Sequence, residues 1–150
     1  MLMPDINILV YAHRQDEQHH ELYAAWLKAL VDGAEPFALS VLVVVGFVRI
    51  VTSRRIYDDP TPLPLALAFV EQLVAHPRCR VAIPSETHLG TVMRLCRAAS
   101  AAGKLVADAQ HAALAISEGC TWVTRDSGFA QFERHGLRWQ HLVLPQTSGL

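Results

Sequence analysis

The residues with the clearest chemical potential are three aspartates, Asp5, Asp108 and Asp126, which lie far apart along the chain. Asp5 stands among apolar neighbours, where an ionised carboxylate is costly to bury unless it is paired or bound to a metal ion. Carboxylate oxygens are the ligands that hard divalent cations such as magnesium prefer, and one or two suffice when water and phosphate complete the shell. The aspartates therefore indicate a metal site, provided that the fold brings them together.

Two of these aspartates also have simpler interpretations. Asp108 lies in the first turn of a predicted helix, where an acid complements the helix dipole and commonly has no other role. Asp126 lies in the segment from Thr124 to Gly128, where Asp and Gly are common turn residues. Asp5 is harder to explain in this way, so the metal hypothesis rests on it first.

Apolar segments alternate with amphipathic ones along the chain, which predicts strands separated by helices. Strands are expected at Leu2–Pro4, Phe37–Leu39, Arg80–Ile83, Thr121–Thr124 and His141–Leu144. Helices are expected at Asn7–His13, from Asp16 or Glu17 to Gly33, from an N-cap at Ser40 to about Ser53, at Pro62–Ala75, Glu86–Ala101, Val106–Glu118 and Phe129–His135.

This alternation predicts a three-layer α/β/α domain with a central, mainly parallel sheet, because parallel neighbours need crossover connections. In such sheets ligands bind at the carboxyl ends of the strands. Asp5 and Asp126 each follow a predicted strand, and Asp108 lies near a helix start. We therefore expect all three carboxylates at one edge of the sheet.

Length and composition indicate a single soluble domain over residues 1–150, since 51% apolar residues support one core and the chain is short for two. The longest apolar run, Phe37–Val48, is shorter than the roughly 20 residues of a membrane helix. No basic residue precedes the apolar start, unlike a secretory signal. We expect a cytoplasmic protein with no membrane partner. Cys79, Cys96 and Cys120 are expected to be reduced thiols.

The net charge of −1 gives no general attraction for nucleic acid, but the charges are unevenly distributed. Eleven of the 13 basic residues are Arg, whose planar fork suits phosphate, and residues 36–57 contain no acid. The candidates for a phosphate-binding track are Arg14, Arg49, Arg54 and Arg55. Scattered solubilising charge remains an alternative for each of them.

Three segments of the chain resemble the acidic motifs of one family. Asp5–Ala12, Ala107–Ala115 and Thr124–Phe129 are similar, in order and spacing, to the first, third and fourth acidic motifs of VapC-type PIN-domain toxins. The resemblance covers nearly the whole chain. It implies a PIN-like fold and an endoribonuclease dependent on Mg²⁺ or Mn²⁺ that cleaves structured RNA, such as tRNA or rRNA. It also implies a homodimer and a cognate VapB-type antitoxin.

The same resemblance implies roles for individual residues. Asp5 and Asp108 are the first candidates for direct metal ligands, and Asp126 is the third acid, bound directly or through water. A cation held in this way activates water for attack on phosphorus and neutralises charge on the leaving oxygen. Asn7 is expected to orient Asp5 or the substrate, and Thr124 to hydrogen-bond a carboxylate. Simple capping is an equally good interpretation of both.

The family's second motif places a Ser at a helix start, a Glu inside the helix and an Arg three residues later. Here Ser40 and Arg49 take the outer positions, and Gly46 stands in place of the Glu. No Asp or Glu between Pro36 and Tyr57 can replace it. Glycine costs about 1 kcal/mol relative to Ala inside a helix, and close packing or a bend is its usual structural explanation. We predict a nuclease weakened by the missing carboxylate, whether the glycine is natural or introduced.

Two other functions remain open from the sequence. A phosphatase would use Asp5 as a nucleophile, but Asn7 stands where that chemistry normally has a second acid. A catalytically inactive module that binds RNA or an antitoxin is the other alternative, and Gly46 favours it. His111, one turn after Asp108, is either a proton donor or phosphate partner, or a half-buried helical histidine.

Overall fold

The computed structural model describes residues 1–143 and contains one parallel sheet of five strands. The strands are β1 (Leu2–Pro4), β2 (Phe37–Ser40), β3 (Cys79–Ala82), β4 (Thr121–Thr124) and β5 (Arg138–His141). Their order across the sheet is β3-β2-β1-β4-β5, and every neighbouring pair is parallel. The predicted α/β class with a parallel sheet is therefore confirmed.

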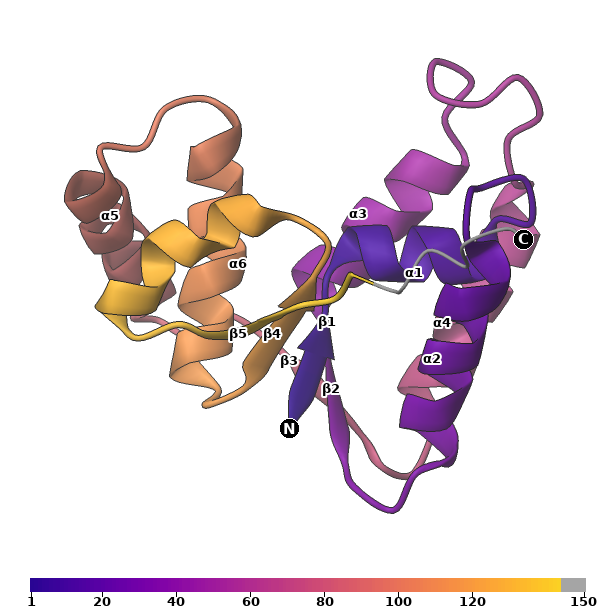
Figure 1. Cartoon of the computed structure of the whole chain (residues 1–150), viewed down its shortest axis with the longest axis horizontal. Helices are drawn as coiled ribbons and strands as arrows, with labels where there is room; N and C mark the ends of the chain where they lie inside the picture. The colour runs from indigo at the N-terminus through magenta and orange to yellow at the C-terminus, as the bar shows by residue number, and fades with distance from the viewer. Residues whose placement is uncertain (144–150) are drawn as a thin grey trace, which may run out of the picture.

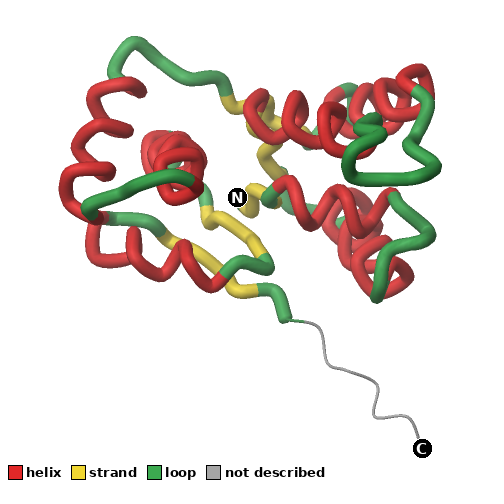
Figure 2. The backbone as a smooth tube through the Cα atoms, turned by 90° about the horizontal axis from the view of Figure 1, so that it is seen from above, coloured by secondary structure: helices red, strands yellow, loops and turns green. Residues whose placement is uncertain are grey.

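Helices cover both faces of this sheet, which gives the three layers (Figure 1). One group consists of α1 (Ile6–His13), α2 (His20–Asp32), α3 (Val41–Val51) and α4 (Leu63–Val74). The other consists of α5 (His88–Ala99), α6 (Lys104–Ser117) and the 3-10 helix η1 (Ser127–His135). Seen from above, the strands run between these two groups (Figure 2).

Strand β1 lies at the centre of the sheet, and later strands are added on either side of it. From β1 the connections lead through β2 to β3 on one side, while β4 and β5 lie on the other side. The boundary between β1 and β4 is thus the point where the strand order reverses, and the loops after these strands separate to leave a crevice at their carboxyl ends. Asp5 directly follows β1, and Asp126 follows β4 with one residue between, so the topology places both at this crevice.

Local signals explain several of the element boundaries. The Ser40 hydroxyl accepts hydrogen bonds from the backbone N–H groups of Leu42 and Val43, which confirms it as the N-cap of α3. Gly33 ends α2 as expected. Gly103 adopts a φ of +58°, which side chains strongly disfavour, and it separates α5 from α6.

Several predicted boundaries, such as those of β3, α5 and η1, are wrong by one or two residues, and three further errors have identifiable causes or consequences. Helix α2 begins at His20 rather than at Asp16 or Glu17, because those two acids bind Arg14 and Tyr57 instead of capping the helix. Helix α6 begins at Lys104 rather than Val106, so Asp108 lies in its second turn and not in its first.

The third error concerns the last strand, which is β5 over Arg138–His141 rather than His141–Leu144. Three of its four residues are exposed, as suits an edge strand, so it carries little apolar pattern. Leu144 lies outside the described residues.

Helix α6, which carries Asp108, packs tightly into the core. Four alanines of α6, at positions 109, 112, 113 and 115, are fully buried, and their small side chains let the helix lie close to the sheet. On the sheet, Trp122 is fully buried against Phe129 of η1. Helix α6 is therefore fixed by close packing on the sheet and by its neighbour α5.

Two further expectations are tested by the fold. No helix within residues 1–143 is long and apolar enough to cross a membrane. The three cysteines are free thiols, as the sequence predicts.

Candidate functional site

A cavity of about 750 Å³ gathers the three aspartates. Asp5 comes from the end of β1, Asp126 from the loop after β4, and Asp108 from α6. Gly46 of α3 lines the same cavity, as does Asn7 of α1. Residues more than 100 positions apart in sequence are thus brought to one crevice, as the sequence analysis expects.

Asp5 is held rigidly at the bottom of this crevice. Its side chain is the N-cap of α1: Oδ1 accepts the backbone N–H of Ile6 at 2.6 Å, and Oδ2 accepts the hydroxyl of Thr124 at 2.6 Å. Only 7% of the residue is exposed. Burial, together with the nearby negative charges of Asp108 and Asp126, raises the pKa of Asp5 to about 6. A carboxylate in these surroundings gains much from a nearby cation.

Thr124 connects two of the acids. Its buried hydroxyl donates to Asp5 and accepts the backbone N–H of Asp126 at 2.9 Å. The carboxylate of Asp126 in turn caps η1, since Oδ1 accepts the backbone N–H of Gly128 at 2.8 Å. The expected bond from Thr124 to a carboxylate is therefore present, and Asp5 and Asp126 each combine a capping role with a place at the cavity.

Lys104, which the sequence patterns did not indicate, is the cation that pairs with two acids of this site. Its ammonium donates to Oδ2 of Asp108 at 3.0 Å and also to Oδ2 of Asp126. The hydrogen bond from Lys104 holds the pKa of Asp126 below its usual value. The pKa of Asp108 is raised, because burial outweighs the lysine. A helix start at Lys104 would have revealed the i,i+4 pair with Asp108, but the predicted helix began two residues later.

The chemistry of the cavity fits a hard divalent cation. The two Oδ2 atoms that meet at the Lys104 ammonium already enclose a positive charge. Asn7 also lines the cavity, and its Oδ1 atom is buried without a hydrogen-bond partner. Within residues 1–143, however, no three His, Cys, Asp or Glu side chains are arranged to hold a metal ion jointly. The lysine, rather than a third carboxylate, completes the acidic pair.

Gly46 is packed closely against α1. A Cβ atom at this position would lie 2.5 Å from Cδ1 and 3.2 Å from Cγ1 of Ile6. The first clash is with the end of a flexible side chain, which can rotate away. Close packing thus gives this glycine a structural explanation, although Gly46 also lines the same cavity as Asp5.

Arg14 occupies a different position from the one expected for a phosphate-binding residue. It is 8% exposed, its guanidinium forms a bidentate pair with Asp16 at 2.6 and 2.8 Å, and it stacks on the Tyr57 ring at 3.9 Å. It also donates to the Asp59 carbonyl at 2.8 Å and to the Thr61 hydroxyl. Arg14 therefore fastens the loop of residues 52–62 to the end of α1 and has little left to offer a phosphate.

The other arginines remain accessible. Arg49 lines the cavity, and Arg54 and Arg55 are exposed on the loop that Arg14 fastens. The guanidinium of Arg125, which was not selected from the sequence, lies over the Tyr11 ring at 4.0 Å, and Tyr11 lines the cavity. The position of Arg125 in the sequence, between Thr124 and Asp126, is the signal that could have indicated it as a site residue.

His111 is a buried rather than a half-exposed histidine. It lines the cavity but is only 8% exposed and stacks on Trp122 with ring centroids 5.3 Å apart. Its Nδ1 atom is buried without a hydrogen-bond partner. Burial lowers the pKa of His111 to about 4, so the ring is neutral at pH 7.

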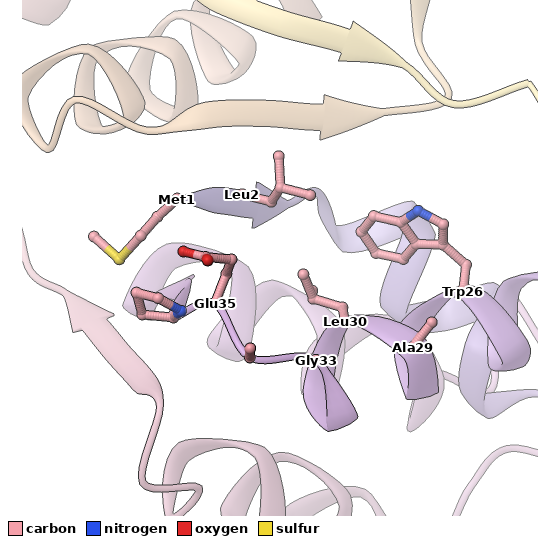
Figure 3. Close-up of a pocket in the computed structure, with 9 residues that line it drawn as sticks. Met1, Leu2, Trp26, Ala29, Leu30, Gly33 and Glu35 are labelled. Carbon is pink, nitrogen blue, oxygen red and sulfur yellow. The ribbon is translucent and has the colours of Figure 1, made fainter.

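A second cavity, of about 620 Å³, lies near the amino ends of β1 and β2 (Figure 3). Leu2, Trp26 and Leu30 dominate its wall, and Glu35 is the one ionisable side chain among its lining residues. It lacks the converging carboxylates of the first cavity, which is therefore the candidate active site.

Comparisons with known proteins agree with this geometry. The PIN domain family matches residues 2–135. Ribonuclease VapC43 of Mycobacterium tuberculosis is 40% identical over 147 residues, covering 98% of this chain and 99% of the relative. Ribonuclease VapC31 of the same organism is 38% identical over 132 residues, covering 88% and 93%.

Solved structures share the fold. The crystal structure of VapBC2 from Rickettsia felis bound to a promoter DNA fragment matches with a TM-score of 0.65 at 19% identity, covering 93% of this chain and 96% of the other. The structure of FitAB bound to a DNA fragment gives a TM-score of 0.65 at 21% identity, covering 93% and 94%. The chain therefore belongs to the PIN-domain family. Its full-length likeness to curated relatives places it among the VapC-type toxin ribonucleases of toxin–antitoxin systems.

Proposed function

We propose that this chain is a divalent-metal-dependent endoribonuclease that cleaves structured RNA, such as tRNA or rRNA, and that its activity is weakened by the glycine at position 46. The observation that carries the proposal is the convergence of Asp5, Asp108 and Asp126 at one cavity, where the strand order reverses. The names of the curated relatives, which are ribonucleases, support the RNA substrate. A phosphatase with Asp5 as its nucleophile is less well supported, because Asn7 stands where that chemistry normally has a second acid.

The proposed direct metal ligands are Asp5 and Asp108, with Asp126 as a third acid that binds directly or through water, and the proposed cation is Mg²⁺ or Mn²⁺. When bound, the cation would lower the pKa of a water molecule and neutralise charge on the scissile phosphate. Thr124 keeps Asp5 oriented by donating its hydroxyl proton, and it fixes the backbone of Asp126. Asn7 contributes an unpaired amide oxygen and lines the same cavity as Asp5. These contacts hold the acids in place before any ligand arrives, which is the main requirement of such a site.

The proposed RNA track consists of Arg49, Arg54 and Arg55. Arg49 is at the cavity, and the other two extend from the loop of residues 52–62. Guanidinium groups suit phosphate because their planar donors match its oxygens. We assign Arg14 to the support of this loop, since its donors are already used.

The weakening at Gly46 is tested by restoring the carboxylate. We expect Gly46→Glu to bind Mn²⁺ more tightly and to cleave RNA faster than the present chain. Gly46→Gln controls for size, and Gly90→Glu adds the same acid to α5, where a Cβ has open space. Because the new side chain meets Ile6, the double variant with Ile6→Val should be measured as well. If Gly46→Glu and its double variant with Ile6→Val cleave RNA no faster than the present chain, the missing-acid hypothesis is rejected.

The nuclease proposal has its own test. Purified protein should cleave tRNA or rRNA with Mg²⁺ or Mn²⁺, and Asp5→Asn and Asp108→Asn should abolish the cleavage. If neither the present chain nor any Gly46→Glu variant cleaves, even with Mn²⁺ and long incubation, the alternative of an inactive RNA- or antitoxin-binding module replaces the nuclease. Close packing of Gly46 on Ile6 is the observation that favours that alternative.

We also propose a cognate VapB-type antitoxin, a homodimer and a cytoplasmic location. The toxin–antitoxin complexes among the solved structures with this fold support the first. Exposed apolar side chains at the edge strand β3, Val81 at 40% and the following Ile83 at 64%, favour self-association. Light scattering of the present chain and of Ile83→Glu would test the dimer.

A further inference from the structure

Lys104 is placed where a helix gains little from a lysine. It is the first residue of α6, close to the positive end of the helix dipole, where a cation is unfavourable. A lysine that precedes its acid by four residues is also in the weaker of the two orders for a helical ion pair. Local helix preferences therefore do not explain this residue.

The acids of the cavity do explain it. The ammonium of Lys104 is shared by Oδ2 of Asp108 and Oδ2 of Asp126, which come from different elements. The side chain of Asp108 is only 12% exposed and that of Asp126 30%, whereas that of Lys104 is 71% exposed. The lysine thus reaches from solvent into an acidic pair that is otherwise short of positive charge.

A third acid in the same cavity, Asp5, adds to the negative charge that a cation must balance. Asp5 is nearly buried, and the negative charges of Asp108 and Asp126 contribute to the raised pKa of its carboxyl. Like charges in one partly buried site repel unless a cation lies between them. Among residues 1–143, the salt bridges to Asp108 and Asp126 come from Lys104 alone.

We propose that Lys104 is a built-in competitor of the metal ion: its ammonium holds the position between Asp108 and Asp126 in the metal-free protein, and a divalent cation must displace it. This inference rests on the proposed metal dependence. One ammonium and one divalent cation cannot share the two Oδ2 atoms, so binding of either excludes the other. Lys104 then sets the cation concentration at which the site fills and keeps the acids paired below it.

The chain offers an internal control, because it contains two lysines, Lys28 and Lys104. Lys28 pairs with Asp32 at the same four-residue spacing, and both side chains are exposed, at 76% and 59%. The two lysines therefore differ in the burial of their partners and in the second acid that only Lys104 contacts.

The first experiment measures lysine reactivity in the full chain. Brief treatment with acetic anhydride, followed by mass spectrometry, gives the acetylation rate of each lysine in EDTA and at rising Mg²⁺ concentrations. In EDTA we expect Lys104 to react about two- to fivefold more slowly than Lys28, because Lys104 makes a second ion pair that Lys28 lacks. Mg²⁺ should raise the rate of Lys104 toward that of Lys28 and leave Lys28 unchanged. A rate at Lys104 that does not respond to Mg²⁺, while calorimetry detects cation binding, overturns the proposal.

The second experiment measures affinity directly. Calorimetry with Mn²⁺ on EDTA-stripped protein should give binding about three- to tenfold tighter for Lys104→Met than for the present chain, and unchanged binding for Lys28→Met. Thermal unfolding adds a readout independent of catalysis: Lys104→Met should unfold at a lower temperature in EDTA and gain more from Mn²⁺.

The outcomes separate this inference from the proposed function. Equal Mn²⁺ affinity in Lys104→Met and the present chain overturns the role of Lys104 and leaves the metal-dependent nuclease standing. Absence of Mn²⁺ binding in both proteins overturns the metal dependence and the competition together. Binding in Lys104→Met alone supports both, because the lysine then excludes the cation completely.

Discussion

Asp5 should destabilise the metal-free fold at neutral pH. Its carboxyl pKa rises from 3.8 to about 6 on folding, chiefly through burial. The folded chain therefore binds this proton more tightly than the unfolded chain does. The free energy of unfolding falls as the pH rises from 3.8 to about 6, and the whole destabilisation is present above pH 6. At about 1.4 kcal/mol per unit of pKa, the cost at pH 8 is about 3 kcal/mol.

The substitution Asp5→Asn should remove most of this cost. The amide oxygen still accepts the N–H of Ile6, but the amide nitrogen cannot accept the hydroxyl proton of Thr124, which loses about 1 kcal/mol. The variant should thus be about 2 kcal/mol more stable than the present chain at pH 8 in EDTA. For a chain of this length, that gain corresponds to a rise in melting temperature of about 4–8 °C.

Urea unfolding, followed by tryptophan fluorescence at pH 8 and pH 5 in EDTA, measures the effect. The advantage of Asp5→Asn should shrink by about 1.4 kcal/mol at pH 5, because most Asp5 carboxyls in the folded chain are then protonated. Asp58→Asn, at an exposed position, is the matched control and should change little at either pH. A variant that is less stable than the present chain at pH 8, or whose advantage is the same at both pH values, would refute the reasoning.

Three further variants test other parts of the site. Arg14→Met should lower the stability by about 1–3 kcal/mol, because it removes the hydrogen bonds to Asp16 and to the Asp59 carbonyl and the contact with the Tyr57 ring. Proteolysis should then cut within residues 52–62, and an intact loop would contradict the role of Arg14. Combined Arg54→Glu and Arg55→Glu should weaken RNA binding and flatten its salt dependence in a filter-binding assay, whereas Arg94→Glu with Arg97→Glu on α5 should not; equal losses would indicate only a net-charge effect. His111→Phe should make the fold less sensitive to acid. Because the pKa of His111 is lowered from 6.5 to about 4, its neutral ring contributes full stability above pH 6.5, and up to about 3 kcal/mol is lost as the pH falls toward 4. Unchanged acid sensitivity in the variant would reject a buried neutral imidazole.

Much of the fold could be predicted because its signals are local. The short segments Leu2–Pro4 and Thr121–Thr124 carry strand-forming residues, and the predicted strands coincide with the observed ones. The N-cap at Ser40 likewise depends on a hydroxyl and the next two backbone N–H groups. Where a boundary depends on tertiary contacts, as at the start of α2, the same signals misled, because Asp16 and Glu17 serve partners elsewhere in the chain.

The candidate site followed a similar division. The convergence of the three aspartates could be anticipated, since parallel strands bring their carboxyl ends to one edge. The role of Lys104 could not, because it depends on Asp126 lying beside α6, across 22 positions of sequence. The burial of Arg14 was equally hidden, since its partners Asp59 and Thr61 lie on a loop more than 40 residues away.

The hydroxyl of Thr124 has a consequence for how this sequence can diverge. It serves Asp5 and the amide of Asp126 at once, and it occupies that place because β1 and β4 pair in parallel, with Pro4 opposite Val123. Inserting one residue into β4 would turn the threonine to the opposite face of the sheet and disconnect both acids. The lengths of β1 and β4 should therefore stay constant among functional descendants, while insertions accumulate in loops such as the one before α6.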